Sequence, residues 1–341
     1  MPKPVLVLMT AVVLTLAAAP AQTQSAARPG YTPPRTAWGD PDLEGVWPST
    51  EMVGVPIERP AQFGTRLYLT DAEFKAVQAN AAKQAQLDTL DFDIEKPPAE
   101  IVALGDVGGA TSPPPHWLER GQPSRQSSLV VDPPDGRIPP YTPAGQARQA
   151  LAKTTYIKQT GFSAPSELGP YDRCISRGVV GSMLPVVYNN GNRIVQAPGY
   201  VVIQNEMIHE VRVVPLDGRG GLPAVFKSYM GSSRGRWEGN TLVVRTTNLN
   251  GVNGLQANGQ LMLTSDDLEL VEKFTRTAAD TVQYEVTITD PKTWTRPWTM
   301  AYPLKAEPDY QMFEYACHEG NYSMRNTLSG SRADEQIGGA R

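Results

Sequence analysis

Hydrophobic and polar residues alternate most regularly late in the chain, between Thr281 and Asp290. Every second residue of this run is apolar, namely Val282, Tyr284, Val286 and Ile288. Successive side chains of a β-strand point to opposite faces of a sheet, so a period of two places these four on one face. The pattern predicts a strand with one buried and one solvated face.

Other β-branched runs, separated by short turns, predict further strands. The turns lie at Pro198-Gly199, at residues 238–240 and at residues 278–280. The predicted strands cover residues 193–197, 200–214, 236–248, 268–277, 281–290, 298–305 and 311–317. Short antiparallel strands in succession are typical of a barrel or a sandwich. We expect a mainly β fold, a lipocalin-like antiparallel barrel over residues 184–330, with a sandwich as the alternative.

The part of the chain before this barrel has a different pattern. Thr70 with Glu73 three residues later forms a capping box, which predicts a helix from there to about residue 87. Thr142-Pro143 opens a second predicted helix, to about residue 159, with proline at its first position. We expect a helical, proline-rich region over residues 22–183 that packs on the barrel, and a flexible tail over residues 331–341.

The first residues match an export signal. Lys3 precedes an apolar run over residues 5–16, and Ala19-Pro20-Ala21 is a small-x-small cleavage pattern. The run is shorter than the roughly 20 residues that a spanning helix needs. We therefore expect residues 1–21 to be a cleaved signal peptide, and a periplasmic or secreted bacterial protein without a transmembrane segment.

Cys174 and Cys317 are the two cysteines of the sequence. In an oxidising compartment an even number of cysteines favours a disulfide. A thiolate nucleophile or metal ligand is the alternative, but neither cysteine belongs to a CxxC pair. We expect a Cys174–Cys317 disulfide.

Composition and charge exclude several classes of function. The formal net charge is -4, with 31 basic and 35 acidic residues and no dense block of either sign, so a nucleic-acid partner is not expected. The sequence holds no P-loop and no G-x-G-x-x-G after a predicted strand. NTPases and dinucleotide-binding enzymes are therefore disfavoured, and no cofactor is expected.

His209 is the first candidate for chemistry. On a continuous strand, alternation would place Asn205, Met207 and His209 on one face, and Glu206 and Arg212 on the other. A barrel bore lined by the first three would bind an amphipathic ligand, and His209 would move a proton near neutral pH. The alternative is a structural histidine bonded to a neighbouring strand.

His318 is the second candidate. A Cys174–Cys317 bond would bring Arg173 close to His318 and Glu319, and the three would bind a carboxylate or take a proton. The alternative is an anchored tail whose charges only stabilise the closure. The spacing of the histidines does not call for a metal, and we assign no metal site.

Two Gly-x-Trp elements, Gly45-Val46-Trp47 and Gly235-Arg236-Trp237, resemble the element that begins the first strand of lipocalin-type barrels. Several longer runs, in order along the chain, carry a broader likeness: GRWEGNTLVV over residues 235–244, WTRPWT over 294–299 and EYACHEGNY over 314–322. With them the sequence resembles a large family of exported bacterial proteins of unassigned activity. The resemblance implies a secreted protein with a lipocalin-like C-terminal half.

Three functions are consistent with these features. The first is binding of a small, partly apolar molecule in the barrel, with Trp237 among the lining residues beside Asn205 and Met207, and with Arg173 and Glu319 at the disulfide. The second is a cofactor-free acid/base enzyme (a hydratase, isomerase or lyase) that uses the same pocket. His209 or His318 would be its acid/base, and Glu206, Arg212 or Arg173 would orient the substrate. The third is an interaction protein of the cell envelope.

Overall fold

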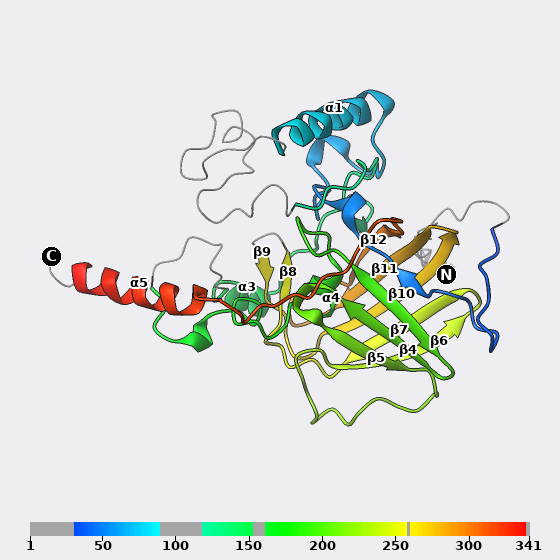
Figure 1. The fold of residues 1–341 in the computed structure, drawn as a ribbon. Coiled ribbons are helices and arrows are strands. Elements are labelled where there is room, and N and C mark those ends of the chain that lie inside the picture. Colours follow the sequence, from blue (N-terminus) through cyan, green and yellow to red (C-terminus); the bar gives the residue numbers. More distant parts are fainter. Residues whose placement is uncertain (1–30, 89–117, 153–160, 258–259, 339–341) are drawn as a thin grey trace, which may run out of the picture.

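Antiparallel sheets dominate the computed structural model, which describes residues 31–88, 118–152, 161–257 and 260–338 (Figure 1). The largest is a 6-stranded sheet in the order β2-β12-β11-β10-β7-β6. Its strands are β2 Val130–Asp132, β6 Ser232–Glu238, β7 Thr241–Thr247, β10 Glu269–Ala278, β11 Thr281–Thr289 and β12 Trp298–Lys305. The alternating residues of β11 are buried on one face as predicted, and β6-β7 and β10-β11 form the predicted hairpins. The mainly β, antiparallel class is therefore confirmed.

The second sheet is 4-stranded, in the order β1-β3-β4-β5. Its strands are β1 Gly45–Val46, β3 Asn192–Ala197, β4 Tyr200–Asn205 and β5 Val211–Pro215. A single strand over residues 200–214 is wrong, because a 3-10 turn, η6 Met207–His209, separates β4 from β5. Ile208 and His209 adopt left-handed backbone angles there, with φ of 58° and 43°. The alternation used to place His209 beside Asn205 and Met207 therefore does not continue through this turn.

The described residues show no strand pairing that closes the two sheets into a barrel. β5 and β6 nevertheless lie side by side at Gly235. A Cβ atom at this position would lie 2.6 Å from Leu216 Cδ2 and 2.8 Å from Val214 Cγ1, so any larger residue would have to displace these side chains. A further 2-stranded sheet joins β8 Leu255–Ala257 to β9 Gln260–Met262. Residues 311–317, predicted as a strand, pair with no strand of the described chain.

The capping box of the first helix is confirmed in α1 Asp71–Asp88. Glu73 N donates to Thr70 Oγ1 at 3.4 Å, and Thr70 N donates to Glu73 Oε2 at 2.8 Å. Thr142 caps α3 Pro143–Gln149 as expected. α3 is shorter than predicted, and residues 153–160 lie outside the described residues.

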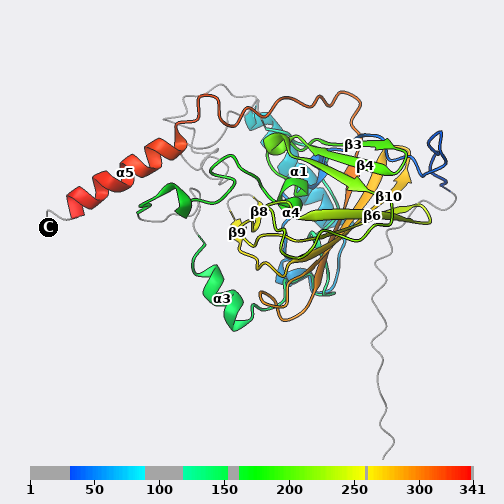
Figure 2. The ribbon, with the colours of Figure 1, turned by 90° about the horizontal axis from the view of Figure 1, so that it is seen from below.

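The chain ends in α5 Ser323–Gly338, which projects from the sheets and continues into the segment expected to be a flexible tail (Figures 1 and 2). Short 3-10 turns occur at η1 Thr50–Met52, η2 Ala61–Phe63 and η5 Pro165–Glu167. No helix of the described chain is long and apolar enough to cross a bilayer. The predicted signal peptide, residues 1–21, lies outside the described residues.

The main core lies between the two larger sheets. Phe274, Tyr284 and Tyr302 are fully buried there and contact one another through their rings. The short helix α4 Val179–Met183 is buried at all five positions, and Tyr302 donates a hydrogen bond to Met183 O at 2.8 Å. Each of the two larger sheets includes a strand from the predicted N-terminal region, because β1 pairs with β3 and β2 pairs with β12.

Candidate functional site

A segment after β12, the C-terminal strap (residues 306–321), runs from the sheets toward α5 (Figures 1 and 2). It is bonded to the segment before α4 by the predicted Cys174–Cys317 disulfide, with Cα atoms 5.7 Å apart. This bond joins positions 143 residues apart in the sequence. The strap therefore brings residues from the end of the folded chain to the β4–β5 turn.

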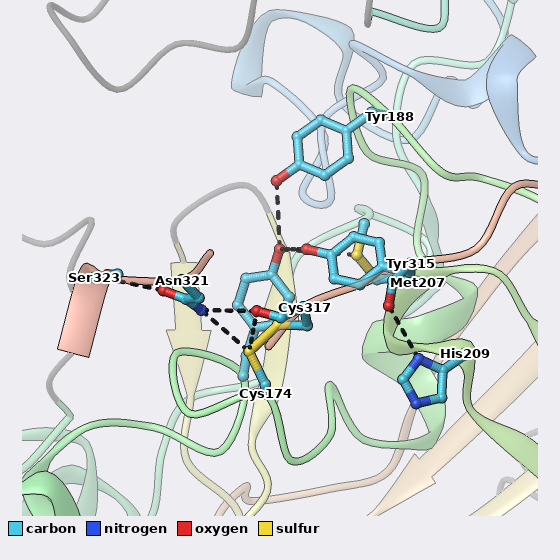
Figure 3. The surroundings of a disulfide bond; sticks show 9 residues. Cys174, Tyr188, Met207, His209, Tyr315, Cys317, Asn321 and Ser323 are labelled. Atoms are coloured by element: carbon cyan, nitrogen blue, oxygen red, sulfur yellow. Dashed lines mark hydrogen bonds between the residues drawn. A yellow bond between two sulfur atoms is a disulfide. The ribbon is translucent and has the colours of Figure 1, made fainter. Parts of the chain in front are cut away.

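Three tyrosine hydroxyls meet beside the disulfide (Figure 3). We call Tyr171, Tyr188 and Tyr315 the tyrosine cluster. Tyr171 Oη lies 3.5 Å from Tyr188 Oη and 3.3 Å from Tyr315 Oη, and it contacts Met207 Sδ at 3.8 Å. The cluster packs on Val186, Met207 and Ile208, which form a separate small apolar core. All three rings are half-buried, so hydroxyl groups and apolar surface lie together at one place.

Arg177 adds a positive charge to this cluster. Its guanidinium lies over the Tyr171 ring, 5.1 Å from the centroid, and only 4% of the residue is exposed. Nε and Nη1 are buried without a hydrogen-bond partner, and within the described ranges no carboxylate forms an ion pair with Arg177. Burial raises the pKa of Tyr315, and the charge of Arg177 opposes this shift.

His209 lies at the edge of the cluster, and its side chain is exposed rather than inside a bore. Its Nδ1 lies 3.1 Å from Tyr315 O (Figure 3). A carbonyl oxygen only accepts hydrogen bonds, so this contact requires a hydrogen on Nδ1. In the neutral ring Nε2 then keeps its lone pair and can accept a proton.

Glu206 holds the strap in place. Its Oε1 accepts from Asn189 Nδ2 at 3.1 Å and Phe313 N at 2.8 Å, while Oε2 accepts from Gly191 N at 3.1 Å and Tyr310 Oη at 2.7 Å. Because four donors occupy the acceptor sites of the carboxylate, Glu206 is better suited to holding the strap in position than to transferring a proton. Phe313 N is used by this bond and is therefore not available for pairing with a strand.

Glu119, from the segment before β2, supports the same region. It accepts from the backbone N–H groups of Asn189 at 2.6 Å and Asn190 at 3.0 Å, and its Oε2 lies 3.1 Å from Tyr310 Oη. Burial, followed by the charge of Glu119, raises the pKa of Tyr310. The tyrosine therefore stays protonated and donates its hydrogen. Gly191 is required beneath the strap, because a Cβ atom there would lie 2.6 Å from Glu206 Oε2.

Arg212 and Asn205 lie elsewhere, in the main core. Arg212 forms two hydrogen bonds with Glu272 of β10, at 2.6 and 2.9 Å, with side-chain exposures of 3% and 0%. Asn205 Nδ2 donates to Asn192 Oδ1 at 2.6 Å, also in the interior. Trp237 lies at the end of β6 and packs on the main core. Among these predicted residues, Met207 and His209 are the ones that reach the tyrosine cluster.

The side chains of Arg173, His318 and Glu319 do not form the predicted cluster. His318 and Glu319 are exposed, and no hydrogen bond or ion pair links the three side chains within the described part of the chain. Asn321 Nδ2 occupies this position instead, donating to Cys317 O at 3.0 Å. The sequence predicted Arg173 at this place, whereas Arg177, three residues beyond Cys174, is the buried cation.

The tyrosine cluster, Glu119 and Tyr310 were missed, because they come from distant segments with no shared motif. Their one sequence signal is proximity to the two cysteines, since Tyr171, Arg177 and Tyr315 each lie within three residues of one of them.

Over residues 31–88, 118–152, 161–257 and 260–338, no group of three or more His, Cys, Asp or Glu side chains is arranged to hold a metal ion. Comparisons of the chain with protein-family models, curated proteins and solved structures found no match.

Proposed function

We propose that the protein binds a small, partly apolar molecule at the tyrosine cluster. The observation that carries the proposal is the combination of apolar side chains with converging hydroxyl groups. Val186, Met207 and Ile208 supply apolar contact, and the tyrosine hydroxyls lie 3.3 and 3.5 Å apart on top of them. Ligand sites in proteins are mostly apolar, with a few polar groups that fix the orientation of the ligand.

This location differs from the barrel bore expected from the sequence. The space between the sheets is filled by fully buried rings such as Phe274 and Tyr302, and by the Arg212–Glu272 pair. A ligand there would have to displace close-packed side chains. The three rings of the tyrosine cluster are only half-buried, so part of their surface is already exposed.

The proposal includes a lipocalin-like scaffold in an exported protein. The scaffold is supported by strands that mostly follow chain order and by the Gly-x-Trp element of β1. Trp47 is 2% exposed, Arg276 lies 5.2 Å from its ring centroid, and its Nε1 donates to Leu43 O. Export is supported by the signal-like N-terminus and the disulfide, since disulfides persist in oxidising compartments.

An acid/base enzyme is the second candidate, and one observation favours it. His209 has its Nδ1 held by a carbonyl group, which directs the basic lone pair to Nε2 on an exposed ring. A histidine with a fixed tautomer is suited to general acid/base catalysis near neutral pH. A His209→Asn variant would then keep ligand binding, while mass spectrometry of the bound compound would show conversion with the wild type alone.

Fluorescence titration with N-phenyl-1-naphthylamine, a neutral apolar probe, tests the main proposal. We expect saturable binding that Tyr188→Ala weakens at least about tenfold, because the variant removes one wall and one hydroxyl. The control is Tyr200→Ala, since Tyr200 is 41% exposed on β4, away from the cluster. Equal effects of the two variants, or no saturable binding to the wild type, would contradict the proposal.

A further inference from the structure

Arg177 is a buried cation at the proposed site, and no anion among the described residues is paired with it. A guanidinium group stays charged at every physiological pH, and a buried charge is normally paired or fully hydrogen-bonded. Arg177 is 4% exposed, yet its Nε and Nη1 atoms have no hydrogen-bond partner. The Tyr171 ring beneath it supplies a cation–π contact, which satisfies the face of the guanidinium but none of its N–H groups.

Two carboxylates that hold the strap, Glu206 and Glu119, are already used by other groups. Glu206 accepts from four donors, one of them the Tyr310 hydroxyl, and Glu119 accepts from the backbone N–H groups of Asn189 and Asn190. Neither forms an ion pair with Arg177. Glu210, which accepts a hydrogen bond from Ser176, forms no ion pair with Arg177 either, so among the described residues no carboxylate lies within ion-pair distance of this guanidinium.

The groups around Arg177 fit an external oxyanion. The planar guanidinium matches the geometry of a carboxylate, and hydrogen bonds between charged partners are about twice as strong as neutral ones. The tyrosine cluster adds hydroxyl donors, with Tyr171 directly under the guanidinium. Met207, which contacts Tyr171 Oη through its sulfur, adds apolar surface at the same place.

We infer that the ligand is a small organic acid whose carboxylate binds Arg177 and whose apolar or flat part packs on the tyrosine cluster and Met207. This inference rests on the proposed function, because it names the chemical class of the molecule bound at that site. The charge of the ligand supplies the partner that the buried guanidinium lacks.

A matched pair of probes tests this inference, 1-naphthoate and its neutral amide, 1-naphthamide, each measured by isothermal titration calorimetry. We expect the wild type to bind the acid at least about tenfold more tightly than the amide. Arg177→Gln should abolish this preference while leaving the affinity for the amide within about twofold. Arg173→Gln is the control, since Arg173 is a half-buried neighbour without a side-chain partner in the described chain, and it should keep the preference.

If Arg177→Gln does not fold, the preference of the wild type for the acid over the amide still tests the inference. Arg177→Lys is a second variant, which keeps the positive charge. Equal binding of the acid and the amide by the wild type would overturn the inference, as would a preference that survives in Arg177→Gln. In both cases binding of N-phenyl-1-naphthylamine would leave the proposed function standing. Failure of all three probes to bind would overturn the proposed function together with the inference.

Discussion

The ion pair in the main core gives the sharpest test of how this fold is stabilised. Arg212 of β5 and Glu272 of β10 connect the two larger sheets through hydrogen bonds of 2.6 and 2.9 Å. Tyr284 donates a third bond to Glu272 Oε1 at 3.1 Å. Glu272→Gln removes the negative charge but keeps a carbonyl acceptor and nearly the same side-chain volume.

The expected loss follows from the burial of the pair. With side-chain exposures of 3% and 0%, water cannot solvate the guanidinium that the variant leaves unpaired. Removing one partner of a buried pair destabilises proteins by about 3–5 kcal/mol, mainly through the uncompensated charge. We therefore expect Glu272→Gln to lower the free energy of unfolding by about 3–5 kcal/mol.

Replacing the whole polar group by apolar side chains should behave differently. In the triple variant Arg212→Met/Glu272→Leu/Tyr284→Phe no charge and no hydroxyl is left unpaired, and such replacements are often neutral or stabilising. Urea unfolding at pH 7, followed by tryptophan fluorescence, measures both variants. A single variant within about 1 kcal/mol of the wild type, or a triple variant less stable than the single one, would refute the reasoning.

Three further predictions concern the disulfide and two carboxylates. Replacing Cys174 and Cys317 by serine should lower the free energy of unfolding by about 5 kcal/mol in the chain-entropy model, measured by urea unfolding of both proteins without reductant. Burial raises the pKa of Glu210 above its usual 4.5, so the folded state disfavours its charged form. The Tm of Glu210→Gln should therefore exceed that of the wild type at pH 7, and the Tm difference should close as the pH falls toward 4.5. The hydrogen bond from Arg66 lowers the pKa of Glu73 from 4.5 to about 2, so the ionised Glu73 contributes its full stabilisation above pH 4.5. The Tm difference between the wild type and Glu73→Gln should shrink as the pH falls from 4.5 to about 2. A Tm difference that stays constant over this range would contradict the prediction.

Local patterns predicted the parts of the fold that depend on neighbouring residues. The alternation in β11 and the capping box at Thr70 depend on spacings of two and three residues, and both are found in the structure. The disulfide followed from the presence of only two cysteines. The β4–β5 turn could not be predicted in this way, because Ile208 is β-branched and rarely adopts a positive φ.

The candidate site was predicted less well, for a physical reason. Arg212 and Glu272 are charged residues in a core, and the sequence analysis treated Arg212 as a side chain available to a substrate. The tyrosine cluster forms between residues as far apart as Tyr171 and Tyr315, which tertiary contacts bring together. His209 and Met207 were identified, but their surroundings depend on a strap that the sequence analysis assigned to a strand.

The C-terminal strap makes the proposed site depend on a segment that is synthesised after every strand of the two larger sheets. The β-sheets are complete at Lys305, but Tyr315 and the carbonyl that orients His209 follow only afterwards. A polypeptide that has formed every strand would therefore still lack one wall of the site and the contacts that hold it. Assembly of the scaffold and completion of the binding site are thus successive events, and ligand affinity reports on the second of them.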